Sequence, residues 1–395
     1  MAPALLSVGF RPFFLAASWF AVVVMGVWVS FLVRGTPSPD PWNPILWHGH
    51  ELLFGFAAAV IAGFLLTAAQ NWTKRPTCTP TSLTALVLLW LAARIGFLAP
   101  GLVPMWLLTA LDLAFFPLLA IMLAGALLPA KNRRNYAFIP LLLAFTVLNA
   151  LLHADAHGIL PGVGFIAMDL SIWLITVLLV FMGGRVIPFF TANWLPGLQV
   201  RQWPWLNWAS TLSTLAILPA YLILGREPWL AAVLFPAAAL TLVRLLAWQP
   251  WGTVREPLLW ILHLSYLFIP IGLAVQGAHL TGFAVNWSAG VHALMVGGMG
   301  GLCIGMMARV ALGHSGRPLK APPLAVAGFA AMILAAATRL FYALSVGPAW
   351  FMDAAGLLWM VAFTLYAIAY TPILVRPRAD APAARDRTRG MTARS

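Results

Sequence analysis

About twelve apolar stretches, each of roughly 20 residues, follow one another along this 395-residue chain, and they constrain its fold more than any other feature. A helix of that length crosses the hydrocarbon of a bilayer and satisfies its own backbone hydrogen bonds there. Hydrophobic residues make up 62% of the sequence and charged residues 8%, which excludes a soluble globular domain. The sequence therefore predicts an all-α polytopic membrane protein with about twelve transmembrane helices.

The charged residues between these stretches predict the orientation. The spans are expected at residues 13–33, 48–69, 83–100, 104–128, 136–153, 165–190, 206–225, 229–247, 257–277, 286–310, 324–344 and 350–375. Nearly all lysines and arginines then fall on one side, and only Arg34 and Arg226 lie in loops on the other. By the positive-inside rule both termini are cytoplasmic, as an even number of spans requires.

The net charge of +13 is better explained by contact with a membrane surface than by binding of nucleic acid. The basic residues do not gather on one amphipathic face, as a nucleic-acid-binding surface would require. Residues 1–375 are expected to form a single transmembrane helical domain. Residues 376–395, rich in Ala, Arg and Pro, are expected to form a disordered basic cytoplasmic tail that contacts anionic lipid.

The second span opens on WHGHE (47–51), which places two histidines and a glutamate at the edge of an apolar helix. His48 and Glu51 share one face of a helix, followed by small residues such as Gly55 that let a flat group or another helix approach. His50 points roughly 200° away from His48, so one metal takes both only if the first turn is unwound. Such a cluster indicates a ligand, ion or proton site; the alternative is a pair of interfacial histidines bonded to water and loop carbonyls.

Other buried ionisable groups are predicted at a similar depth in the outer half of the membrane. They include Arg94, Asp112, His153, Asp169 and Arg339. Interhelical salt bridges would explain them. Their common depth also favours a shared polar cavity, and both interpretations remain open.

The tenth predicted span carries a second candidate ligand. His292, Met295, Met299, Cys303 and Met306 share one helical face, and imidazole, thioether and thiol groups suit copper or haem iron. A methionine stripe at this spacing is also typical of plain packing. His292 has no charged neighbour in sequence and is level with His48, so it is interpreted as a ligand.

His263 lies near the cytoplasmic end of the ninth predicted span, roughly 12 Å in height from His292. It therefore belongs to a different site from His292. The two interpretations are a second metal, with Met299 and Cys303 at the same depth, and a hydrogen bond to a backbone carbonyl of a neighbouring helix.

Three spans end in related sequences, one every four spans: FLLTAAQNWTKRP (64–76), VIPFFTANWLPG (186–197) and MMARVALGHSGRP (306–318). The chain can be read as three units of four helices, or the likeness is a coincidence between aromatic-basic helix ends. Twelve spans with helices two and ten facing each other resemble, in topology only, the catalytic subunit of the heme-copper oxidases. The sixth and seventh spans hold no histidine, so the three-histidine copper site of that subunit has no counterpart here.

Several longer motifs are similar to those of the NnrS family. They are GFRPFF (9–14), WHGHELLFGF (47–56), GFLLTAAQNWT (63–73), GGRVIPFFTANW (183–194), ILHLSY (261–266) and HALMVGGMGGLCIGMMARVALGHSGRPL (292–319). The resemblance implies a bacterial inner-membrane protein that contains haem and copper and is linked to nitric oxide metabolism and resistance. By motif position it implies importance for His48, His50, Glu51, Arg185, His263, His292, Arg309 and His314, without assigning a metal to any histidine.

Two functions follow from these observations. The first is a haem-dependent oxidoreductase similar to a nitric oxide reductase, with haem held by His48 or His50 together with His292, propionates paired with Arg94 and Arg339, and Glu51 as the catalytic proton carrier. The haem would be b-type, because no CxxCH motif for covalent attachment is present, and electrons would come from quinol or a redox protein. The second is a small-solute transporter or a gas- or metal-binding protein without turnover.

Overall fold

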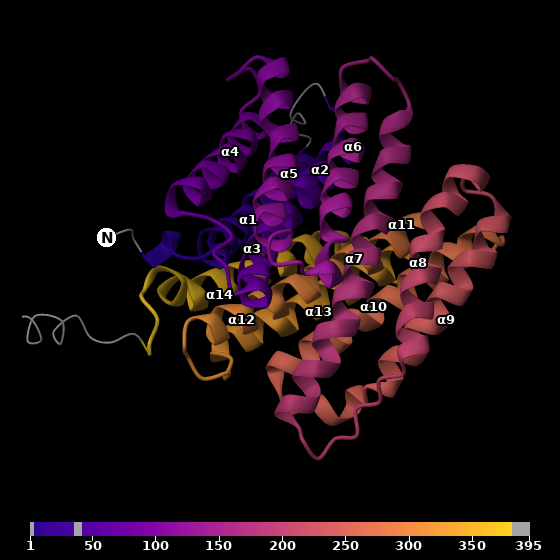
Figure 1. The fold of residues 1–395 in the computed structure, drawn as a ribbon. Coiled ribbons are helices and arrows are strands. Elements are labelled where there is room, and N and C mark those ends of the chain that lie inside the picture. The colour runs from indigo at the N-terminus through magenta and orange to yellow at the C-terminus, as the bar shows by residue number, and fades with distance from the viewer. Residues whose placement is uncertain (1–3, 35–41, 381–395) are drawn as a thin grey trace, which may run out of the picture.

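The computed structural model describes residues 4–34 and 42–380, which form helices and loops without a strand. The α-helices are α1 (Phe10–Arg34), α2 (Pro44–His50), α3 (Ala58–Thr73), α4 (Pro80–Leu98), α5 (Met105–Leu127), α6 (Phe138–Ala156), α7 (Val163–Trp194), α8 (Pro204–Leu224), α9 (Ala231–Ala247), α10 (Pro257–Leu280), α11 (Trp287–His292), α12 (Gly301–His314), α13 (Pro323–Ala343) and α14 (Trp350–Val375). Figure 1 shows their arrangement. In the described ranges twelve helical segments are long and apolar enough to cross a membrane, and they match the predicted spans to within a few residues. The predicted fold class is confirmed.

The second and tenth spans are each built from three consecutive helical pieces. A π-helical segment, η2 (Glu51–Ala57), joins α2 to α3, and another, η6 (Ala293–Gly300), joins α11 to α12. π-helical turns are rare, and they occur often at functional sites. Each of these two segments begins at the residue that follows a histidine.

Side-chain caps determine where the two spans begin. The Asn43 side chain accepts a hydrogen bond from the backbone N–H of Ile45, and Pro44 occupies the first helical turn. At the start of α11 the Asn286 side chain accepts in the same way from the N–H of Ser288. Both histidine-bearing spans therefore begin about one turn before their first histidine.

The centre of the bundle consists of the second, sixth and tenth spans. In their most apolar windows 83%, 78% and 72% of the residues are buried, more than in any other described span. These are also the three spans whose ends are related in sequence. The division of the chain into three units stays a prediction.

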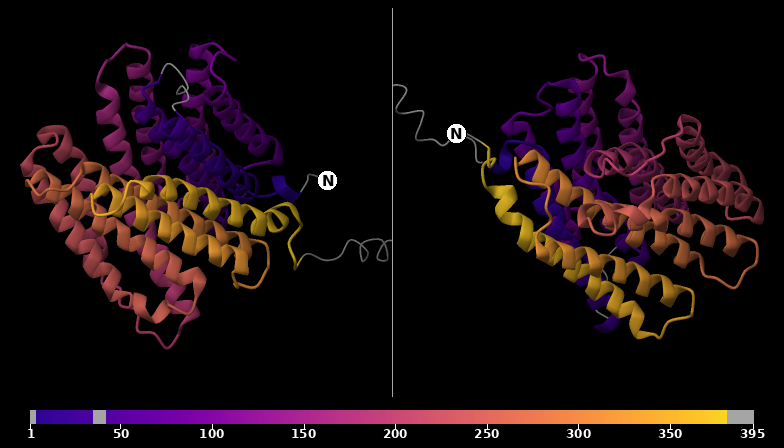
Figure 2. Two further views of the ribbon diagram at one scale, coloured as in Figure 1. Left: turned by 180° about the vertical axis from the view of Figure 1, so that it is seen from behind. Right: turned by 90° about the horizontal axis from the view of Figure 1, so that it is seen from below.

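The first and last spans lie side by side, as both views in Figure 2 show. Arg11, in the first turn of α1, donates from Nη1 to the carbonyl oxygen of Leu374 at the end of α14, at 2.8 Å. Beyond α14, the backbone N–H of Ala379 donates to the carbonyl oxygen of Ser315 at 2.9 Å. The first and last described segments of the chain therefore meet at one end of the bundle. The predicted disorder of the tail falls mostly on residues 381–395, which lie outside the described residues.

Candidate functional site

A cavity of about 310 Å³ lies among α1, α2, α7, α11, α13 and α14; we call it the histidine pocket. Its polar lining residues are His48, Ser288, His292, Arg339 and Asp353, and most of the remaining lining is apolar. The pocket lies toward the end of the bundle where even-numbered spans begin and odd-numbered spans end. The structure thus brings together His48, His292 and Arg339, as their predicted common depth requires.

Each of the two imidazoles of this pocket is fixed by one contact and keeps a ring nitrogen without a hydrogen-bond partner. The His48 ring stacks on Trp28, with ring centroids 4.3 Å apart, and its Nδ1 is buried without a hydrogen-bond partner. The Nδ1–H of His292 donates to the carbonyl oxygen of Ser288 at 2.7 Å, which leaves a lone pair on Nε2. The described residues provide no hydrogen bond to Nε2 of either ring. Each imidazole therefore has a nitrogen available as a ligand.

Arg339 brings a positive charge to the pocket that is only partly satisfied by hydrogen bonds. One of its Nη atoms donates to Ser288 Oγ at 3.2 Å, and the other is buried without a partner. Within the described ranges no carboxylate lies in ion-pair distance of Arg339. A half-buried, incompletely paired guanidinium favours an anionic group in the same cavity.

The methionine and cysteine stripe of the tenth span is divided between two cavities. Met295 and Met299 line the histidine pocket. Cys303 and Met306 line a separate cavity of about 90 Å³ whose walls are almost entirely apolar. The four soft groups therefore do not converge on a single ion.

His263 is buried and does not line the histidine pocket, in agreement with its predicted height. Its Nδ1–H donates to the carbonyl oxygen of Leu259 at 3.1 Å, and its Nε2 lies 3.5 Å from Thr191 Oγ1. The carbonyl belongs to its own helix α10, not to a neighbouring helix. The predicted metal role of His263 stays a prediction.

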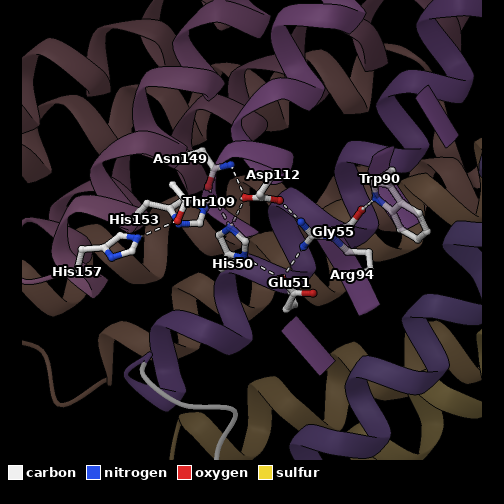
Figure 3. Close-up of polar contacts among 10 residues, drawn as sticks. All are labelled: His50, Glu51, Gly55, Trp90, Arg94, Thr109, Asp112, Asn149, His153 and His157. Carbon is white, nitrogen blue, oxygen red and sulfur yellow. Dashed lines mark hydrogen bonds and ion pairs between the residues drawn. The ribbon is translucent and has the colours of Figure 1, made fainter. Parts of the chain in front are cut away.

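A second group of ionisable residues forms what we call the polar cluster, shown in Figure 3. Its members come from the second to fifth spans and are at most 3% exposed: His50, Glu51, Arg94, Asp112, Asn149 and His153. Arg94 is the only cation with a permanent charge among them. Its guanidinium bonds one oxygen of Glu51, at 2.5 Å, and one of Asp112.

The histidines of the polar cluster converge on the same carboxylate. His50 Nε2 and His153 Nε2 each lie 3.0 Å from Asp112 Oδ2. One ligand atom from each of these three residues lies within 4.8 Å of the other two, so the group could hold a metal ion. The WHGHE segment thus sends its two histidines to different sites, as the predicted 200° separation requires.

Not all of the ionisable groups predicted at this depth are brought together. Arg94 and Arg339 are in different sites. Asp169 is in neither, because its Oδ2 accepts from Tyr221 at 2.8 Å and pairs with Arg226 at 2.7 Å. The two interpretations offered by the sequence therefore both apply: Arg94 forms interhelical ion pairs, and Arg339 lines a cavity.

Sequence reasoning missed several residues of these sites. Asn149 and His157 were not singled out, although they stand four residues before and after His153, in α6 and directly after it, and form with His153 a polar face that could have been recognised in the sequence. Thr109 connects His153 to His157 through its hydroxyl. Nothing in the sequence indicated that Trp28 stacks on His48, because the two residues come from different spans.

A family model described as NnrS protein matches residues 4–378. The chain belongs to the NnrS family. No curated protein matches it. The NnrS motif residues occupy several places in the fold: His48 and His292 line the histidine pocket, and His50 and Glu51 belong to the polar cluster.

The other NnrS motif residues serve packing and loop contacts within the described structure. Arg185 donates from Nη1 to Asn135 Oδ1 at 2.9 Å. The Arg309 guanidinium lies 4.0 Å above the centre of the Phe190 ring. His314 lies 3.4 Å from the Asn71 side chain, near the meeting point of the first and last described segments. Membership of this family suggests metal or haem binding, and the buried group of His50, Asp112 and His153 could hold a metal ion.

Proposed function

We propose that this NnrS-family protein is a multi-pass protein of the bacterial inner membrane that binds a b-type haem in the histidine pocket and binds or reduces nitric oxide, or a related small nitrogen oxide, there. The observation that carries the proposal is the convergence of His48 and His292, from the second and tenth spans, on one largely apolar cavity. The family name fits a role connected with nitric oxide.

The residues of the pocket fit a haem by their chemistry. Neutral imidazole nitrogens are common axial ligands of haem iron, and His48 and His292 each have an unpaired nitrogen. A volume of about 310 Å³ is within the range of ligand pockets. The guanidinium of Arg339 suits a propionate carboxylate, because one of its Nη atoms is buried without a hydrogen-bond partner.

Haem bound here would supply a redox-active iron for chemistry on nitric oxide. The chain contributes the environment of that iron. Trp28 holds the His48 ring by stacking, and the Ser288 carbonyl fixes the tautomer of His292. The apolar walls exclude water and admit a small, weakly polar gas.

Arg94 is assigned a different role from Arg339. Both of its Nη atoms already bond carboxylates, so we assign the propionate contact to Arg339 alone. Glu51 lies in the polar cluster, where its Oε2 is buried without a partner. We retain Glu51 as the proposed proton carrier on the outer side of the pocket.

The test uses the full-length protein purified in detergent. The parent protein should show a Soret band, and His48→Ala and His292→Ala should each abolish or shift it, because losing a strong-field imidazole changes the iron. Met299→Leu is the matched control: Met299 lines the same cavity, and a swap of similar volume typically costs less than about 1.5 kcal/mol.

Turnover is tested separately by nitric oxide consumption in the presence of an electron donor. Consumption that requires His292 supports a reductase, and stoichiometric binding without consumption supports a gas-binding protein. If His292→Ala keeps the parent spectrum while Met299→Leu loses it, the haem has been placed on the wrong residues.

A further inference from the structure

We propose that the polar cluster is a metal site separate from the histidine pocket, which takes a divalent first-row transition-metal ion through His50 Nε2, His153 Nε2 and Asp112 Oδ2. The inference does not depend on haem in the other pocket. It rests on the hydrogen-bonding pattern, the arrangement of the groups behind the ligands, and the charge of the cluster (Figure 3).

The hydrogen bonds of His50 leave a mismatch that a cation would remove. Nδ1 lies 2.8 Å from Glu51 Oε1, while Nε2 faces Asp112 Oδ2 at 3.0 Å and Asn149 Oδ1 at 2.9 Å. A neutral imidazole has a single N–H, so donation to Glu51 leaves the lone pair of Nε2 facing two oxygen acceptors. In the structure Asn149 Nδ2 donates to Asp112 at 2.7 Å. Exchanging the oxygen and nitrogen of the Asn149 amide would therefore give His50 Nε2 a donor but leave two oxygen atoms, of Asn149 and Asp112, facing each other. An electron-pair acceptor beside Nε2 resolves the contact.

The groups behind the three ligands have the arrangement that metal sites use. His50 is held at Nδ1 by Glu51, and His153 is held at Nδ1 by Thr109 Oγ1 at 3.0 Å. The second oxygen of Asp112, Oδ1, is held by Arg94. Partners of this kind orient metal-binding imidazoles and carboxylates and keep their free atoms directed at one point. Asn149 Oδ1, 2.9 Å from His50 Nε2, offers a further oxygen ligand on the side of His50.

Charge also favours a bound cation. Glu51 and Asp112 bring two carboxylates into a region that is at most 3% exposed, and Arg94 supplies one permanent positive charge. Two ionised carboxylates and neutral histidines therefore leave a buried excess of negative charge. A divalent ion bound between the two imidazoles and Asp112 would remove this negative excess and leave the cluster with one net positive charge.

The donor atoms indicate the class of ion. Two imidazole nitrogens with carboxylate and amide oxygens suit Zn²⁺, Cu²⁺ or Fe²⁺, whereas Mg²⁺ and Ca²⁺ prefer oxygen ligands alone. No cysteine or methionine belongs to the cluster, so ions that require thiolate are not favoured. The exposed His157, 2.8 Å from Thr109 Oγ1, marks the side from which an ion reaches the cluster.

The experiment measures metal retained by the full-length protein in detergent. The protein is stripped with a chelator, loaded with Zn²⁺, Cu²⁺, Fe²⁺ or, for comparison, Mg²⁺ alone, dialysed, and assayed for metal by mass spectrometry. We expect about one non-haem ion per chain in the parent. His153→Ala and Asp112→Asn should each weaken retention at least about tenfold.

Two control variants distinguish the polar cluster from nearby histidines and from the histidine pocket. His157→Ala removes the histidine that directly follows α6, four residues after His153, and should keep the ion. His292→Ala should keep the ion even where it changes haem content, so failure of the proposed haem site and failure of this site are distinguishable. Size-exclusion profile and thermal unfolding establish that each variant is folded, and only the parent and the controls should gain thermal stability on adding Zn²⁺.

Three results would overturn the proposal. The first is a folded parent that retains no more metal than the double variant His50→Ala, His153→Ala; the cluster would then hold protons and hydrogen bonds only. The second is retention of Mg²⁺ as strong as that of Zn²⁺. The third is retention that depends on His292 rather than on His153, which would place the ion in the histidine pocket.

Discussion

Removing the charge of Arg94 should be among the most damaging single changes in this protein. In Arg94→Met the side chain keeps most of its length but no longer pairs with Glu51 and Asp112. At the 2.5 Å that separates Arg94 Nη1 from Glu51 Oε1, the attraction is about 7 kcal/mol for an effective dielectric constant of about 20. Removing one partner of a buried ion pair typically costs about 3–5 kcal/mol, because the remaining charge is left buried and unpaired. We therefore expect Arg94→Met to lose about 3–5 kcal/mol of unfolding free energy.

The assay is reversible unfolding by SDS in mixed micelles, followed by circular dichroism on metal-free protein. Arg226→Met is the matched control, because Arg226 also pairs with a buried aspartate, Asp169, but its own side chain is 43% exposed. Water solvates the Arg226 side of this pair, so Arg226→Met should cost less than Arg94→Met, although more than the loss of a fully exposed pair. Adding Glu51→Gln to Arg94→Met should recover part of the loss. If Arg94→Met and Arg226→Met differ by less than about 1 kcal/mol, water reaches the polar cluster and the reasoning is refuted.

Three further predictions concern the whole bundle. Reporter fusions to either terminus should be active only as cytoplasmic reporters, and activity outside the inner membrane would contradict the predicted orientation. Cys78 lies in the loop between α3 and α4, and burial raises the pKa of its thiol. Maleimide labelling of Cys78 should therefore be slower than that of a free thiol at pH 7 and should accelerate as the pH rises. The buried Cys303 should be labelled only after unfolding. Gly301→Ala should destabilise by about 1–3 kcal/mol because the new methyl group would lie 2.1 Å from Ser265 Oγ, whereas Gly125→Ala, with open space around it, should be neutral or stabilising by up to about 1 kcal/mol in the same SDS titration.

The sequence predicted the level of each polar residue but not its neighbours. Hydropathy and charge locate each span and therefore the depth of each residue in it, so His48 and His292 were expected at one level and both line the histidine pocket. The helical angle between His48 and His50 correctly predicted that they point to different sites. Which helices stand side by side depends on packing between distant segments. For this reason the pairing of Arg94 with Asp112 and the separation of Arg94 from Arg339 were not predictable from one sequence.

The π-helical segments were unpredictable for a related reason. An α-helix and a π-helix have nearly the same local preferences, and the choice between them depends on close contacts with other helices. In η6 a methyl group on Gly297 would lie 2.2 Å from the Phe268 ring of α10, so the backbone of η6 packs directly on that side chain. Nothing in the local sequence predicted the wider turn that follows His292.

The pairing of α1 with α14 has a consequence for the order of events during synthesis. Roughly 300 residues separate these two helices, so at ~5–20 residues per second a ribosome needs about 15–60 s to complete α14 after α1 has emerged. During that interval the first helix is inserted in the bilayer without its final neighbour, and the Arg11 guanidinium lacks the Leu374 carbonyl that it later bonds. A nascent chain of this protein therefore depends on other partners, such as α3 or insertion machinery, until its last helix arrives, and chains truncated before residue 374 cannot close the bundle.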